Sequence, residues 1–268
     1  MELTLLTMGA GNVIVLEETF RSFSKVCNEI IYGDLLLFPE DREILHSYKL
    51  KYNLKIVEFP FDFIFKNGFS AILNELSPHA TNDMCVYANT SEIIEEDFGI
   101  EKAISGNPYC NMFFFTHETD PHRWFRTYDR RNLKWSGLIH ESVVGDERPY
   151  HKSIFQMADL EKDLMNPFKA RVLNDVKEIV YFTNYMRIID EPNMLGGTDP
   201  GWVHFAEANY ESMAYRLRKK GKRYEAFKNG DYIAYMNAVY TDPEFQVEKF
   251  ESSDAIEFQG DPRYLGKK

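Results

Sequence analysis

A short stretch of the chain, DMCVYANTSE over Asp83 to Glu92, joins apolar residues directly to polar ones. The apolar part, Cys85 to Ala88, is typical of a buried strand, and residues 89 to 92 end it abruptly with two small hydroxyl groups, an amide and a carboxylate. A strand that ends in this way places polar groups at the edge of a sheet. We therefore take residues 89 to 92 as candidate binding residues.

Two earlier segments also end in residues that suit a nucleotide. Leu3 to Met8 is a predicted strand, and Gly9, Gly11 and Asn12 follow it, so the backbone there can approach a ligand closely. The turn matches neither a Walker loop nor a full dinucleotide fingerprint. A second predicted strand ends at Asp34, whose carboxylate could contact a nucleoside; an ordinary turn residue would explain it as well.

A histidine and a glutamate stand side by side at the end of the segment KWSGLIHE, as His140 and Glu141. A neighbouring imidazole and carboxylate can transfer protons. The alternative is purely structural: His140 would cap a strand, and Glu141 would begin a helix, where its charge favours the helix dipole.

The elements that must position these residues alternate between strand and helix. Predicted strands at Leu3 to Met8, Glu29 to Asp34, Leu54 to Phe59 and Met84 to Ala88 are separated by helical patterns, which include Pro39 to Lys51 and Asn67 to Leu76. This alternation predicts an α/β fold with a mostly parallel sheet and helices on its faces. Ligands of such sheets bind beyond the carboxyl ends of the strands, which is where the polar residues lie.

The second half of the chain changes character. Three more predicted strands are followed by three predicted helices: Asn111 to Thr116, Trp124 to Tyr128 and Lys134 to His140, then Asp159 to Asp190, Gly201 to Lys220 and Arg223 to Tyr240. We therefore expect a catalytic domain over residues 1–158 and an α-helical C-terminal extension over residues 159–268.

Four motifs, in order and over about residues 1 to 150, resemble those of nucleotide-sugar glycosyltransferases of the GT-A type, family 2. They are VCNEIIYGD, FDFIFKNGFSAIL, DMCVYANTSE and HRWFRTYDRRNLKWSGLIHE. The second is similar to the family's Asp-Phe-x-x-x-Arg-Asn helix start, and the last to the aromatic-x-Gly-x-x-His-Glu motif of one subgroup. The compact form also looks like glycosyltransferases that large bacteriophages carry.

The resemblance implies a GT-A (Rossmann-like) fold and an inverting transfer of a sugar from a uridine-linked donor to a hydroxyl acceptor. It implies Glu141 as the general base and His140 as a phosphate or metal contact. It assigns the donor contacts to Gly9, Gly11, Asn12, Asp34, Asp62, Lys66, Asn67, Asn89 and Ser91. An ordinary N-cap at Asn67 would explain the start of that helix as well.

One departure from the family's pattern concerns the metal. Where the family has an Asp-x-Asp motif for a divalent cation, this chain has the neutral residues Asn89 and Ser91. Either Mn²⁺ or Mg²⁺ is held by Glu92, Ser91, His140 and the diphosphate, or no ion is needed. In the second case cations such as Lys66, Arg123 or Arg126 would stabilise the leaving phosphate. A third alternative is an inactive GT-A module that binds a nucleotide sugar or a protein partner.

Composition limits the partners. The chain has 268 residues, 44% of them hydrophobic, and a net charge of −11, which disfavours nucleic-acid binding through the overall field. Two basic clusters nevertheless leave modified DNA, with a hydroxymethylated base, as an alternative to a glycan acceptor: residues 123–134 and 216–223. The three cysteines suit free thiols, and no leader or long apolar run occurs, so we expect a cytoplasmic protein (in the host cytoplasm if viral) without membrane insertion.

Overall fold

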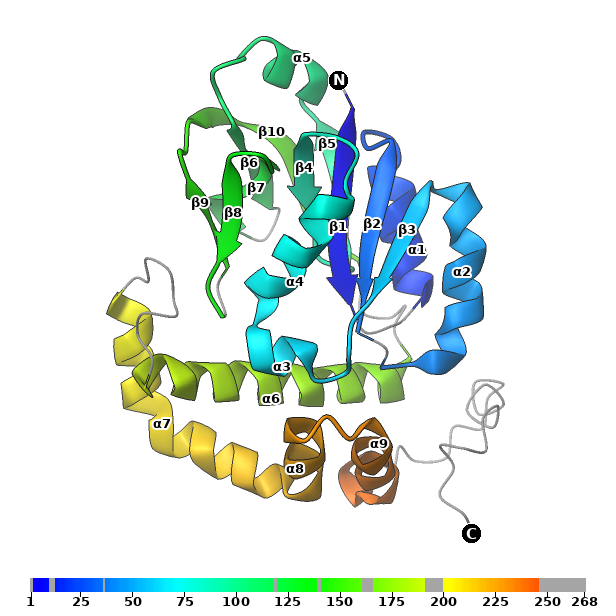
Figure 1. The fold of residues 1–268 in the computed structure, drawn as a ribbon, viewed down its shortest axis with the longest axis vertical. Helices are drawn as coiled ribbons and strands as arrows, with labels where there is room; N and C mark the ends of the chain where they lie inside the picture. Colours follow the sequence, from blue (N-terminus) through cyan, green and yellow to red (C-terminus); the bar gives the residue numbers. More distant parts are fainter. Residues whose placement is uncertain are drawn as a thin grey trace.

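An eight-stranded mixed sheet forms the centre of the protein (Figure 1). It is seen in a computed structural model, which describes residues 2–9, 13–35, 37–117, 120–138, 141–160, 166–190 and 200–245. The strand order is β3-β2-β1-β4-β7-β6-β10-β5. The strands are β1 (Leu3–Gly9), β2 (Glu29–Asp34), β3 (Leu54–Glu58), β4 (Met84–Tyr87), β5 (Glu92–Asp97), β6 (Met112–His117), β7 (Asp120–Asp129) and β10 (Pro149–Asp159).

Most neighbouring strands run in the same direction. The pairs β3–β2, β2–β1, β1–β4 and β6–β10 are parallel, whereas β7 runs against both β4 and β6, and β5 runs against β10. The carboxyl ends of β1, β2, β3 and β4 therefore meet at one edge of the sheet. A small second sheet pairs β8 (Leu133–Ser136) with β9 (Ser142–Gly145).

Helices cover both faces of the sheet, and this explains why β1 and β2 are buried along almost their whole length. On one face lie α1 (Val13–Phe23), α2 (Arg42–Lys51) and α5 (Ile100–Ser105), which share a core with β1 and β2. On the other face lie α3 (Phe63–Asn67), α4 (Phe69–Leu76) and the small sheet. Short 3-10 helices occur at Pro39–Asp41, Ser77–His79 and Pro243–Phe245.

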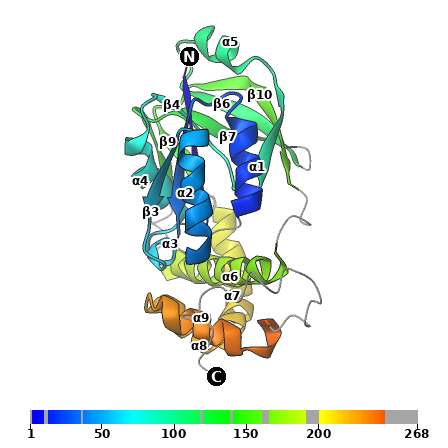
Figure 2. The same cartoon turned by 90° about the vertical axis from the view of Figure 1, so that its right-hand side faces the viewer.

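The C-terminal helices lie against the carboxyl edge of the sheet rather than apart from it. In Figures 1 and 2, α6 (Pro167–Asp190) crosses below the ends of β1, β2 and β3, and α7 (Pro200–Lys220), α8 (Lys222–Lys228) and α9 (Tyr232–Thr241) follow. Phe61, just after β3, packs on Phe227 and Tyr235 with ring centroids 4.5 and 5.2 Å apart. The extension thus shares one hydrophobic core with the sheet.

The predicted fold class, an α/β mostly parallel sheet flanked by helices and followed by an α-helical C-terminal extension, is confirmed. Three strands were not predicted: β5, β9 and β10. Asp159 ends strand β10 instead of beginning a helix, and α6 begins at Pro167. β5 reads EIIEED, a poor strand sequence by propensity, and it forms because it pairs along β10 at the edge of the sheet.

Two predicted helices are interrupted at glycines. The helix predicted over Asn67 to Leu76 begins only at Phe69, as α4; Asn67 is instead the last residue of α3, and Gly68, where φ is +81°, separates the two helices. The helix predicted over Arg223 to Tyr240 is divided into α8 and α9 by a turn at Gly230, where φ is +69°. Both conformations favour glycine because they lie in the left-handed region.

Two further properties concern the whole chain. The cysteines form no disulfide, and burial raises the pKa of the Cys85 thiol to about 12. None of the described helices combines the length and the apolar character that crossing a bilayer requires.

Candidate functional site

The polar turn that follows β4 is held in a fixed shape by its own hydrogen bonds. The Glu92 carboxylate accepts hydrogen bonds from the backbone N–H of Asn89 at 2.7 Å and from its side-chain amide at 2.8 Å. Thr19 of α1 donates to the Thr90 carbonyl at 2.8 Å. A Cβ atom at Gly9 would lie 2.7 Å from the Thr90 methyl group, so the end of β1 needs glycine to let this turn approach.

A buried ion pair lies directly behind the turn. Arg126 of β7 contacts the two Glu92 oxygens at 3.2 and 3.3 Å, and its guanidinium lies 4.7 Å from the centre of the Tyr87 ring and 5.0 Å from that of Phe115. Glu92 is only 3% exposed. With the two bonds from Asn89, each Glu92 oxygen accepts two hydrogen bonds, which is the number that a carboxylate oxygen can accept in its plane.

Two side chains that the sequence did not indicate join this cluster. His117, at the end of β6, and Asp159, at the end of β10, each bring one ligand atom to within 4.8 Å of a Glu92 oxygen and of each other. The Ser91 hydroxyl lies 3.5 Å from the Asp159 carboxylate. Sheet register explains the meeting, because Asp159 pairs with Glu92. Strand β10 was not predicted, so the position of Asp159 at its end could not be inferred from the sequence.

Glu92, His117 and Asp159 have the atom types of a divalent cation site, but their present partners do not fit an ion. Glu92 has no oxygen left for a metal while Arg126 and Asn89 occupy both. A divalent ion at Glu92 would also stand next to the guanidinium cation. Arg126 thus already supplies the positive charge that compensates this carboxylate.

Glu141 lies close enough to Tyr87 and Tyr181 for its charge to act on both hydroxyl groups. Burial raises the pKa of Tyr87 well above its usual value, and the negative charge of Glu141 raises it further. Burial also raises the pKa of Tyr181 on α6 to about 12, again with a contribution from Glu141. The Tyr87 hydroxyl donates to the Asn89 side chain at 2.9 Å, so Tyr87 helps to hold the turn.

Residues of α4 and the turn before it hold the segment Trp135 to Leu138, which leads to Glu141. The N–H of Phe69 donates to the Leu138 carbonyl, and a Cβ atom at Gly68 would lie 2.7 Å from Leu138 backbone atoms. Asn74 of α4 bonds both the N–H and the carbonyl of Trp135, at 2.9 and 2.8 Å. The motifs FDFIFKNGFSAIL and KWSGLIHE therefore meet in space.

The other predicted residues divide into two groups. Asp34 is buried at the end of β2, in register with Gly9 of β1, so these two share the sheet edge with Asn89, Ser91 and Glu92. Asp62 and Lys66 pair with each other instead, and the Asp62 carboxylate lies against Gly230 between α8 and α9.

Asn67 donates to the carbonyl of Phe63 and is exposed. Four predicted residues lie outside the part that the structure describes: Gly11, Asn12, His140 and the side chain of Arg123.

No family model and no curated protein sequence matches the chain. Among solved structures, S. aureus TarS 1–349 in complex with UDP-GlcNAc has 11% identity and a TM-score of 0.44, with 94% of each chain covered. The longer S. aureus TarS structure has 9% identity and a TM-score of 0.44, and the match covers 92% of this chain and 50% of that chain, so this chain spans half its length.

GalNAc-T7 with UDP, GalNAc and Mn²⁺ has 10% identity and a TM-score of 0.35 over 64% of this chain and 31% of that one. These identities and TM-scores are too low to establish a family or a ligand.

Proposed function

We propose that the protein is an inverting GT-A glycosyltransferase, which transfers a hexose or pentose from a uridine diphosphate sugar to a hydroxyl acceptor. The observation that carries this proposal is the gathering of polar groups at the carboxyl edge of the sheet: the Asp34 carboxylate in register with Gly9, and the turn at residues 89–92 held by Tyr87 and Glu92. A donor and an acceptor that react must be held at one place. Strand ends and a carboxylate gathered at one edge provide such a place.

The donor is assigned to the first part of this edge. Asp34 ends β2 in register with Gly9 of β1, and we assign its carboxylate to the contact with the ribose or base. Asn89 and Ser91 line the next strand end. Because Asp62 pairs with Lys66 and lies against Gly230, we assign these two residues to the border of the donor site and not to a direct contact with the diphosphate.

In the proposed reaction Glu141 takes the proton of the acceptor hydroxyl. The hydroxyl oxygen then forms a bond to the anomeric carbon while the bond from that carbon to the diphosphate breaks, and the electron pair leaves with the nucleoside diphosphate. A divalent cation, where bound, would neutralise charge on the leaving diphosphate. We assign Arg126 a positioning role: through Glu92, which already compensates its charge, it holds the turn at residues 89–92 in place.

The Glu141→Gln variant tests the general base. General-base catalysis contributes about 10²- to 10⁴-fold, so turnover should fall by that factor while donor affinity changes little. Glu147→Gln, an exposed site in the loop after β9, is the matched control and should keep full turnover. The donor is found first by a thermal-shift screen against nucleotide sugars. Full turnover of Glu141→Gln would remove Glu141 from the mechanism.

Metal use is tested by assaying turnover with a chelator and with added manganese. Unchanged rates are expected, because Glu92 is saturated by Arg126 and Asn89. A rate abolished by the chelator and restored by manganese would show that an ion, bound elsewhere or after rearrangement, is required.

A second candidate is a non-catalytic module that binds a nucleotide sugar. The neutral Asn89 and Ser91, together with the compensated charge of Glu92, favour it. Hydrolysis of the donor without acceptor separates the two functions, since a working transferase transfers sugar slowly to water. The acceptor is assigned to a glycan or to modified DNA in the cytoplasm.

A further inference from the structure

A cavity of about 320 Å³ lies between α6 and α7. Four aromatic side chains form its apolar wall: Tyr181, Phe182 and Tyr185 of α6, and Phe205 of α7. The Tyr185 and Phe205 rings are 5.2 Å apart, and Phe205 is 45% exposed. The amide of Asn209 and the hydroxyl of Ser212 supply polar groups beside these rings. An apolar wall with a few polar groups is typical of small-molecule sites.

This cavity continues along the same pair of helices into a wider one of about 1010 Å³. Asn174, Glu178 and Arg216 line both cavities, so the two form one groove along α6 and α7. We call it the α6–α7 groove. Its far end reaches Glu244 and Phe245, which follow α9.

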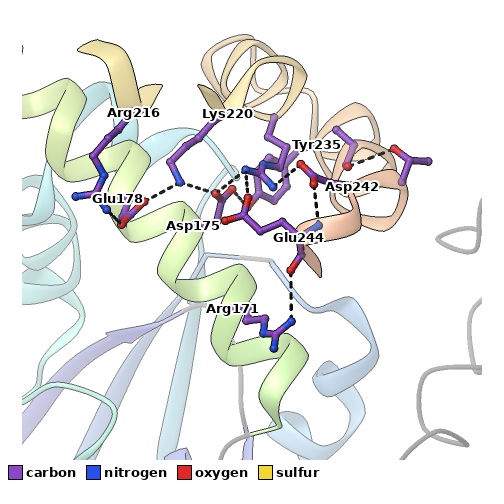
Figure 3. A network of polar contacts seen from close by, with 11 residues as sticks. Arg171, Asp175, Glu178, Arg216, Lys220, Tyr235, Asp242 and Glu244 are labelled. Atoms are coloured by element: carbon purple, nitrogen blue, oxygen red, sulfur yellow. Dashed lines mark hydrogen bonds and ion pairs between the residues drawn. The ribbon is translucent and has the colours of Figure 1, made fainter. Parts of the chain in front are cut away.

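The wider part of the groove has a fixed wall of mixed charge (Figure 3). Asp175 binds Lys220 at 2.6 Å and the Tyr235 hydroxyl at 3.0 Å. Arg223 contacts Asp242 at 2.8 Å and Glu244 at 3.2 Å, and it is 3% exposed. Burying such charges is costly and is weak evidence of stability, so a functional reason for them is worth testing.

Within the part of the chain that the structure describes, one donor of this wall lacks a partner. The Nε atom of Arg223 is buried and makes no hydrogen bond to any described residue. A buried donor without a partner carries a free-energy cost, so this charged wall is not optimised for stability alone.

The aromatic end of the groove adjoins the candidate site. Tyr181 packs on Phe69, with ring centroids 5.4 Å apart, and Phe69 bonds the Leu138 carbonyl just before Glu141. Burial and the charge of Glu141 both raise the pKa of Tyr181. A molecule that enters beside Tyr181 therefore lies close to the proposed general base.

We propose that the α6–α7 groove binds the acceptor, and that this acceptor is an oligosaccharide. The assignment rests on the proposed glycosyltransferase function and adds the class of the acceptor to it. The apolar face of a sugar ring suits the aromatic wall formed by Tyr185 and Phe205. Sugar hydroxyls both donate and accept, so a wall that mixes carboxylates, cations and amides can satisfy them.

The same lining disfavours nucleic acid. A duplex presents a dense row of phosphates, which bind best to an uncompensated row of cations. Here the six basic residues of the groove are accompanied by four carboxylates, Asp175, Glu178, Asp242 and Glu244, which already pair with Arg216, Lys220 and Arg223. The chain also has a net charge of −11. Hydroxyl-rich neutral chains face no such repulsion.

The test starts with the full chain on an array of neutral and acidic oligosaccharides, followed by titration of the best-bound one. Phe205→Ala should weaken its binding by about tenfold, since aromatic anchors at the centre of a site carry much of the affinity. Tyr210→Ala is the matched control, because Tyr210 lies on the same helix, is 40% exposed and does not line the groove. Asn209→Ala is a second groove variant, and thermal melting checks that each variant is folded.

Binding of an oligosaccharide that weakens in Phe205→Ala and Asn209→Ala but not in Tyr210→Ala supports the inference. Absence of oligosaccharide binding, equal weakening in all three variants, or salt-sensitive binding of 20-nucleotide duplex DNA in its place overturns it. The donor screen separates this outcome from the fate of the proposed function. Donor binding without oligosaccharide binding removes the groove assignment alone, and oligosaccharide binding without any donor removes the transferase assignment.

Discussion

Replacing Arg126 by methionine tests whether the buried cation holds the candidate site together. The substitution keeps an unbranched apolar side chain between the Tyr87 and Phe115 rings and removes only the charge and its hydrogen bonds. Glu92 would then stand 3% exposed with no compensating cation at this position. The two donors of Asn89 would remain.

The size of the effect follows from burial. Breaking a buried ion pair by removing one partner costs about 3–5 kcal/mol. Because Asn89 continues to satisfy one bond on each Glu92 oxygen, we expect the lower end, about 3 kcal/mol. For a chain of this size that loss corresponds to a decrease in Tm of about 6–12 °C. Turnover should decrease as well, because the turn at residues 89–92 loses its support.

The measurement is chemical and thermal unfolding of wild type, Arg126→Met, Glu92→Gln and the double variant. The double variant should regain about 2 kcal/mol over Arg126→Met, because it contains no buried unpaired charge. Arg148→Met is the control: the Arg148 side chain is 57% exposed and its partner Asp146 is 70% exposed, so this surface ion pair should contribute less than about 1 kcal/mol.

Manganese extends the test. In Arg126→Met the Glu92 oxygens are released toward His117 and Asp159, so added manganese should raise the Tm of this variant and leave the wild type unchanged. The reasoning is refuted if Arg126→Met loses less than about 1 kcal/mol, or if the double variant is as unstable as the single one.

Two further perturbations probe the frame around the site. Gly68→Ala should destabilise the fold by about 1–3 kcal/mol and lower turnover, because φ is +81° there and the new Cβ would lie 2.7 Å from Leu138 backbone atoms. Thermal melting and an activity assay measure the two effects. An unchanged Tm would contradict the close packing. Glu29→Gln should cost about 1–3 kcal/mol at pH 7, because buried Glu29 accepts four hydrogen bonds. Burial alone would raise the pKa of Glu29, but these bonds lower it below its usual 4.5, so the stability they add is present above that pH and is lost as the pH falls further. Unfolding curves of wild type and variant should therefore converge in acid, and a constant difference between pH 7 and pH 3 would contradict the assignment.

The sequence determined the first half of the sheet well. Strands buried on both faces leave continuous apolar runs, as in LTLLTM and MCVY, and those runs ended where β1 and β4 end, with polar residues directly after them. Periodic apolar residues likewise located α1 and α4. The polar strand ends at Gly9, Asp34 and Asn89 could be named for the same reason, since parallel strands bring their carboxyl ends to one edge.

Only the tertiary structure decided which of these polar groups meet. Strand β10 is identified by its pairing with β6 and β5, and this pairing brings His117 and Asp159 beside Glu92. The sequence around His117 and Asp159 does not contain that information. From the sequence, Arg126 was one of several candidate cations for the diphosphate, and only the order of the strands shows that it pairs with Glu92. Local pattern depends on neighbours along the chain, whereas the pairing of charges depends on which distant strands lie side by side.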